Sequence, residues 1–114
     1  MVKEPFEAPY ETEIENELEE FKRIVGGHIE CVPLADIPGT VLICNDEGKL
    51  QGLAPNLFLN MDVICGTVIA AGVSGEEFAD LPKSAALKVW LRLTIRALHR
   101  PEETDRAAGL SDQP

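Results

Sequence analysis

A nearly unbroken apolar run between residues 62 and 72 constrains the fold of this 114-residue chain more than any other feature. The run reads Asp-Val-Ile-Cys-Gly-Thr-Val-Ile-Ala-Ala-Gly, and its β-branched residues favour an extended conformation. Because apolar and polar residues do not alternate along it, neither face is suited to water. We therefore expect a central strand buried on both sides, with a bulge or a close backbone approach at Gly66.

The stretch Val41–Asn56 is typical of a β-hairpin. An apolar run leads to a polar tip of five residues, and a short second run returns to a Pro-Asn turn. Gly48 is expected to supply the positive φ angle that such a loop usually needs. Asn45, Lys49 and Asn56 are candidate ligand- or partner-binding residues. The adjacent acids of the tip are more typical of solvated turn formers than of catalytic groups.

A short acidic helix is expected near the N-terminus, over residues 15–25, and it ends at the pair Gly26-Gly27, which offers a left-handed cap. Its expected buried face consists of Ile14, Leu18, Phe21 and Val25. The six glutamates from Glu11 to Glu20 are interpreted as a solvated face, with a charged decoy surface as the alternative.

The remaining signals favour an α+β fold. Residues 29–34 resemble a strand that ends at Pro33, and two prolines limit residues 1–10 to an edge position. The sequence thus predicts an antiparallel or mixed sheet of four to five strands, with the short acidic helix and a longer C-terminal helix. We expect one domain over residues 1–100 and a flexible tail over 101–114.

The C-terminal helix is expected over residues 83–100 and ends before a proline. Its apolar residues fill roughly 200° of the helical wheel, and Val89 falls outside that arc, among the cations. The arc consists of Leu93, Ala86, Ala97, Trp90, Thr94, Leu87, Leu98, Leu91 and Ile95. So wide an arc exceeds what one small sheet covers, so we expect a dimer or other homo-oligomer through this helix, with Trp90 as its anchor.

Four cations recur along one face of the same helix, with no acid among residues 83–101. They are Lys88, Arg92, Arg96 and Arg100. One interpretation pairs them with the acidic first helix, in the same chain or across a dimer. The alternative is an anion pocket at a dimer interface, where arginine forks bind the phosphate of a nucleotide-type ligand.

The formal net charge is −10, and it is unevenly distributed. Residues 1–50 hold twelve acids and four bases, whereas residues 83–114 hold six bases and four acids. Direct nucleic-acid binding and contact with anionic membranes are disfavoured, because phosphates would be repelled. A basic protein partner, or mimicry of a nucleic acid's charge, is compatible with this surface.

The three cysteines, Cys31, Cys44 and Cys65, each lie within an apolar run and lack a C-x-x-C pair. This pattern predicts free, buried thiols in a reducing cytosol, and no metal site or other cofactor. The chain also has neither a signal peptide nor a long apolar span, so a cytoplasmic location in a bacterial host is expected.

Three motifs in order resemble the DUF3846 family, over about residues 14–80. They are VGGHIECVPL at 25–34, ICNDEGKLQGLAPN at 43–56 and DVICGT at 62–67. The N-terminal segment is shorter and more broken by prolines than is usual in the family, and the last helix is longer and more apolar. The resemblance implies a small domain of unknown function from phages, plasmids and other mobile elements, and it implies no catalytic residue.

No catalytic motif is present: the chain has no G-x-S-x-G, no P-loop and no G-x-G-x-x-G. We therefore expect a non-catalytic accessory protein of a phage or mobile element that inhibits a host defence component by protein–protein contact. Two alternatives remain open at this point. One is a sponge for a small anionic nucleotide-type signal at a basic dimer interface, and the other is an acidic nucleic-acid mimic.

Overall fold

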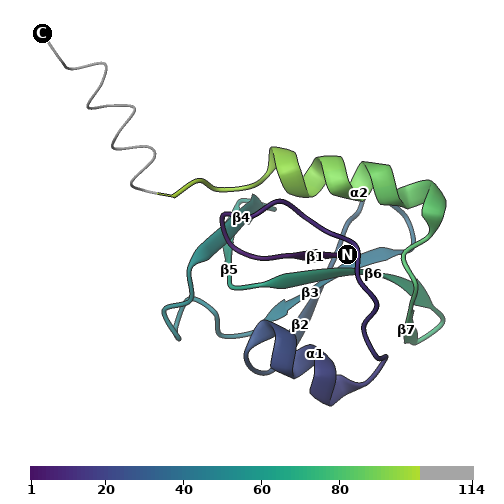
Figure 1. The fold of residues 1–114 in the computed structure, drawn as a ribbon, viewed down its shortest axis with the longest axis horizontal. Coiled ribbons are helices and arrows are strands. Elements are labelled where there is room, and N and C mark those ends of the chain that lie inside the picture. Colours follow the sequence, from purple (N-terminus) through teal and green to yellow (C-terminus); the bar gives the residue numbers. More distant parts are fainter. Residues whose placement is uncertain (101–114) are drawn as a thin grey trace, which may run out of the picture.

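The computed structural model describes residues 1–100 and shows three layers, with one helix on each side of a central sheet (Figure 1). The sheet is five-stranded and antiparallel, in the order β1-β6-β3-β2, and β7 pairs with the same strand, β6, as β1 does. Its strands are β1 Val2–Lys3, β2 Ile29–Pro33, β3 Thr40–Asn45, β6 Val68–Ser74 and β7 Glu77–Ala79. The predicted α+β class is confirmed.

The two central strands, β3 and β6, send alternate side chains to opposite layers. Ile43 and Ile69 pack against the first helix, α1 (Leu18–Val25), together with Phe21 and Val25 of that helix. Their neighbours in the strands join the second core beneath the last helix, α2 (Lys83–Ile95). These neighbours are Leu42, Cys44, Val68 and Ala70. A strand without polar alternation is thus covered on both faces, as expected.

The apolar run 62–72 forms two strands instead of the single strand predicted. β5 (Asp62–Cys65) pairs with β4 (Pro55–Leu59) in a small second sheet, and β6 begins at Val68 in the main sheet. The chain turns between them at Gly66, whose φ is 92°. A Cβ on Gly66 would lie 2.8 Å from Leu53 Cδ1, so the predicted close approach at this glycine is confirmed.

The predicted hairpin Val41–Asn56 is wrong. β3 pairs with β2 and β6, while β4 pairs with β5, so the two runs belong to different sheets. Gly48 does not have a positive φ angle; Gly52, at 72°, has one instead. Gly48 is needed for space, because a Cβ there would lie 2.5 Å from the carbonyl oxygen of Cys65.

Helix α1 begins three residues later than predicted and ends at Gly26, whose φ of 87° confirms the left-handed cap. Phe21 and Val25 are buried and Ile14 packs against them, but Leu18 is 52% exposed. The predicted buried face is therefore wrong at Leu18, which lines an open cleft together with Phe21 and Phe78. Strand β2 ends at Pro33 as predicted.

Helix α2 is five residues shorter than predicted, because residues 96–98 run beside β4. The N–H of Phe58 donates to the Arg96 carbonyl, and the N–H of Leu98 donates to the Asn56 carbonyl, each at 2.9 Å. The N–H groups of Arg96 and Ala97 still donate back to Arg92 and Thr94, and from Leu98 the bond to Asn56 takes the place of a helical one. Residues 96–98 therefore lie against the small sheet. The tail predicted over 101–114 lies outside the described residues.

The three cysteines differ in how far they are exposed. Cys44 is buried, but Cys31 is exposed on the edge strand β2 and Cys65 is half-buried, so the expectation of three buried thiols is wrong. All three cysteines are free.

β1, two residues long, is an edge strand as predicted. Within residues 1–100, no helix is long and apolar enough to span a bilayer.

Candidate functional site: the outer face of the last helix

Helix α2 is apolar on its outer face as well as on the face that meets the sheet. The inner face consists of Ala85, Val89 and Leu93, all buried. The outer face consists of Leu87, Trp90, Leu91 and Ile95, which are 68%, 39%, 44% and 72% exposed. A helix that is apolar on two faces normally has both covered, so the outer face has the character of a contact surface.

The assignment of inner and outer sides corrects the prediction from the helical wheel. Val89 was expected among the cations on the solvent side, yet it is completely buried. The residues of α2 that face the sheet are Ala85, Val89 and Leu93, which form a narrow strip at one edge of the apolar arc. Most of the wide arc therefore faces outward. The expected excess of apolar surface is therefore present. The anchor role of Trp90 stays a prediction.

Two of the four predicted cations have partners within the chain. The guanidinium group of Arg92 donates two hydrogen bonds to Asp36, in the loop before β3, one of them 3.0 Å long. This bidentate pair lowers the pKa of Asp36 and raises that of Arg92. Arg100 lies 3.8 Å from Glu7 and stacks on the ring of Phe6, 4.9 Å from its centroid. Both arginines thus fasten loops to the domain.

The other two cations, Lys88 and Arg96, are exposed beside the apolar outer face. Among residues 1–100, neither has a carboxylate within 4 Å. Pairing with α1 in the same chain, one of the two predicted interpretations, is wrong because α1 lies on the opposite side of the sheet (Figure 1). Pairing across two copies of the chain is not affected by this finding.

The polar residues of the predicted hairpin have structural roles. Asn45 Nδ2 donates to the Val25 carbonyl at 3.2 Å and to Gln51 Oε1 at 3.0 Å, so Asn45 ties the end of α1 to the turn after β3. Lys49 forms an ion pair with Asp62 at the start of β5. Asn56 is completely buried.

Asn56 belongs to a buried network that sequence reasoning missed. Lys3, 1% exposed, donates from Nζ to Asn56 Oδ1 at 2.6 Å and to the Glu4 carbonyl at 3.3 Å. Asn56 Nδ2 in turn donates to the carbonyls of Lys3 and Gly66, both at 2.8 Å. Burial lowers the pKa of Lys3. The only sequence signal was a lone lysine in an apolar N-terminus.

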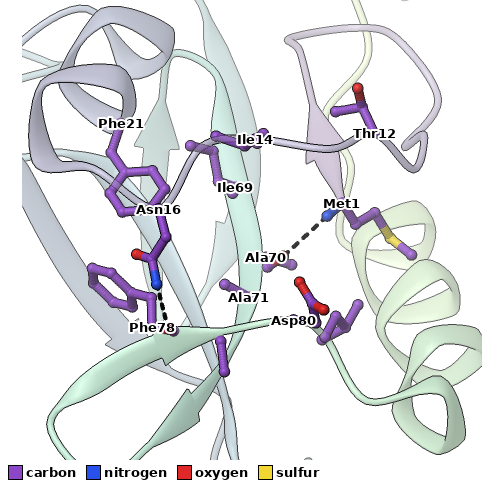
Figure 2. A pocket seen from close by; sticks show the side chains of 12 residues that line it. Met1, Thr12, Ile14, Asn16, Phe21, Ile69, Ala70, Ala71, Phe78 and Asp80 are labelled. Atoms are coloured by element: carbon purple, nitrogen blue, oxygen red, sulfur yellow. Dashed lines mark hydrogen bonds between the residues drawn. The ribbon is translucent and has the colours of Figure 1, made fainter.

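A cavity of about 120 Å³ beside β6 was also not predicted, and it is lined by residues of both cores, Phe21 and Ile69 from one and Met1 and Ala70 from the other. Figure 2 shows Phe21 and Phe78 at one end of it and Asp80 at the other, with Ala70 and Ala71 between them. The two rings meet edge to face with centroids 5.2 Å apart. The segment before α1, which includes Ile14 and Asn16, borders the cavity, and Asn16 Nδ2 fastens it to β7 by donating to the Phe78 carbonyl at 2.7 Å.

A metal site and an activated thiol each have structural requirements that can be compared with the described residues. Within residues 1–100, no group of three or more His, Cys, Asp and Glu side chains is placed to hold a metal ion. Burial raises the pKa of the Cys44 thiol to about 12, which keeps it protonated at neutral pH. Burial also raises the pKa of Cys31. Neither thiol has the lowered pKa of an activated nucleophile.

Comparison with known proteins yields a family but no characterised relative. No curated protein and no solved structure matches the chain. The model of a family described as a domain of unknown function matches residues 1–93. The match is longer than the resemblance over 14–80, and it includes β1 and most of α2. The chain therefore belongs to the DUF3846 family, a domain of unknown function.

Proposed function

We propose that this protein is a non-catalytic accessory protein that acts by binding another protein, and that the outer face of α2 is its contact surface. The observation that carries the proposal is the exposed apolar ridge on a helix whose inner face is already fully used by the sheet. Exposed contiguous apolar side chains of this size mark interaction sites in soluble proteins. An aromatic anchor such as Trp90 is typical of their centres.

The setting of the proposal follows the resemblance described above. A phage or mobile-element protein that inhibits a host defence component by contact needs a recognition surface and no catalytic group. The exposed ridge supplies such a surface. Lys88 and Arg96, exposed next to the apolar ridge, favour a target with an acidic rim around an apolar centre.

The anion-sponge alternative has less support. A phosphate pocket needs several cations with free donors, yet Arg92 is held by Asp36 and Arg100 lies against Glu7 and Phe6. The nucleic-acid mimic has less support too, because Glu19 and Glu20 of α1 are partly neutralised by Lys22 and Arg23 in the next turn.

The test is site-specific photocrosslinking in a bacterial lysate. A crosslinking amino acid at position 87 or 95, on the outer face, should give a defined covalent adduct with a target protein. A crosslinker at position 50 is the matched control, since Leu50 is 87% exposed but lies on a distant loop. The double substitution Leu87→Gln with Leu91→Gln, carried by the chain labelled at 95, should abolish the adduct.

Two results would count against the proposal. Adducts of equal yield from position 50 would show that capture is not specific to α2. An adduct at 95 that survives the double substitution would show that the apolar ridge is not what holds the target. Far-ultraviolet circular dichroism of each variant separates these outcomes from loss of folding, and both substituted side chains are largely exposed.

A further inference from the structure

The α1 side of the molecule carries a groove that is apolar at its floor and acidic at its rim. The cavity described above adjoins a second, more open cleft, and Asn16, Phe21 and Phe78 line both. Leu18, which is half-exposed, joins the floor. The rim carries Glu76, Glu77 and Asp80. We call this surface the acidic groove.

The outer face of α2 has the complementary character. Leu87, Leu91 and Ile95 follow one another at intervals of four residues and form a ridge, and such ridges pack into grooves of other elements. Lys88 and Arg96 lie beside the ridge. Within the described part of the chain neither forms an ion pair within 4 Å, although the charge of Arg96 helps to lower the pKa of Asp36.

The ridge of α2 and the acidic groove of the same chain cannot meet, because the sheet separates them. Val89 of α2 packs in one core, whereas Phe21, at the floor of the groove, packs in the other (Figure 1). Any contact between the two surfaces must therefore join different molecules. A second copy of the chain is the one partner known to present the matching surface, since every copy carries both.

We propose that the outer face of α2 of one copy docks into the acidic groove of another, so that the protein self-associates head to tail. The proposal goes beyond the proposed function, because the two use the same contact surface and the ridge that each assembly leaves unoccupied stays available to a target protein. The apolar ridge covers the floor, with Leu18 and Phe78 beneath it. Lys88 and Arg96 face the rim acids, and these pairs fix partner and orientation more than affinity.

A head-to-tail contact has a consequence that a symmetric dimer lacks. The two surfaces lie on opposite sides of the sheet, so each added copy leaves one ridge and one groove unoccupied. Such a heterologous contact continues until a ring closes or the concentration limits it. The average mass should therefore rise through and beyond twice the 12.4 kDa of the chain as concentration increases.

The test combines sedimentation equilibrium with two charge reversals. The ridge variant is Lys88→Glu with Arg96→Glu, and the groove variant is Glu76→Lys with Glu77→Lys. Each variant alone places like charges on both surfaces, so each should remain at the mass of the single chain. An equimolar mixture should associate again, because each variant then supplies the charge that the other one lost. Asp46→Lys with Glu47→Lys makes the same charge change at the other end of the sheet and should associate like the unsubstituted chain.

Every other result overturns the inference. An unsubstituted chain that stays monomeric excludes it. A mass that stops at two copies and survives the groove variant identifies a symmetric α2 dimer, which leaves the proposed function intact. Separate variants that do not recover on mixing show that the two surfaces do not meet. Because the crosslinking test uses a target protein, the proposed function and this inference can fail independently.

Discussion

At the scale of single residues, the buried pair of Lys3 and Asn56 carries a dense set of hydrogen bonds. Asn56 contributes one acceptor and two donors to it, and all are used. Replacing Asn56 by Ala leaves the Lys3 ammonium and two carbonyls without these partners. We expect the free energy of unfolding to fall by about 3 kcal/mol or more in urea denaturation.

Lys3→Met is the matched substitution in the same network. It removes the buried charge together with its bonds and leaves only Asn56 Oδ1 unpaired. The expected loss is therefore smaller, about 1–3 kcal/mol. If Lys3→Met is as damaging as Asn56→Ala, the lost packing of the lysine stem outweighs the hydrogen bonds, and the network has less importance than its geometry indicates.

The pH dependence of stability gives an independent check on Lys3. Its folded pKa is lowered by burial, an effect that the charge of Glu7 partly opposes. In the window between that lowered pKa and the ordinary value of about 10.4, the unfolded chain binds more protons at this site than the folded chain does. Stability relative to Lys3→Met should accordingly rise with pH through that window. A difference that falls or stays flat in paired urea titrations contradicts the assignment.

The cysteines should differ in reactivity. Cys31 is exposed, whereas Cys44 is buried with a pKa raised to about 12. An aromatic disulfide reagent at pH 8 should therefore modify Cys31 in the folded protein and Cys44 only when the protein unfolds. Cys31→Ser should remove the early phase without changing the late one, and rapid modification of Cys44 in the folded Cys31→Ser protein would refute the difference.

At the scale of elements, the ends of helices and strands follow from local sequence, whereas the pairing of strands does not. The ends of β2 and α1 followed from Pro33 and from Gly26, whose effects are local. The false hairpin had suitable turn residues, but β3 already has partners on both sides. The end of α2 depends on hydrogen bonds to β4, forty residues away, which no local pattern reveals.

At the candidate site too, some features follow from local sequence and others only from the fold. An excess of apolar surface on α2 was predictable from the width of its arc. Which residues face outward depended on where the sheet touches the helix, so Val89 was misplaced. The acidic groove had no signal along the chain, because its floor joins Phe21 of α1 to Phe78 of β7, and only the folded sheet brings these together.

The junction of the two sheets permits an element-scale prediction at Gly66. Gly66→Ala faces both a φ of 92° and a contact of 2.8 Å with Leu53. Gly75→Ala is the control, because its φ of 64° is also left-handed but nothing lies within 4 Å of the added Cβ. The control should cost about 1–2 kcal/mol in the free energy of unfolding and Gly66→Ala clearly more. Equal losses of unfolding free energy in the two variants would show that the Leu53 side chain moves aside at little cost.

At the scale of the whole molecule, the net charge is strongly negative and the acids and cations are unevenly distributed between the two sides of the sheet. The acids concentrate before residue 83, and the exposed cations Lys88 and Arg96 lie on the opposite side of the sheet from the acidic groove. Two copies of a chain with net charge −10 repel one another at a distance. In contact, however, head-to-tail docking brings unlike charges together. The two effects respond to salt in opposite directions.

Salt can therefore separate head-to-tail docking from unspecific apolar association. Above about 0.1 M salt, charges more than about 10 Å apart are largely screened, so further salt acts mainly on the close pairs at the interface. Raising the concentration from about 0.1 to about 0.5 M should lower the average mass of the unsubstituted chain at fixed protein concentration, measured by sedimentation. In the variant Lys88→Glu with Arg96→Glu the interface charges are alike, so the same increase should raise the mass or leave it unchanged. A rise in both proteins would assign the association to apolar contact alone, because screening then only relieves repulsion.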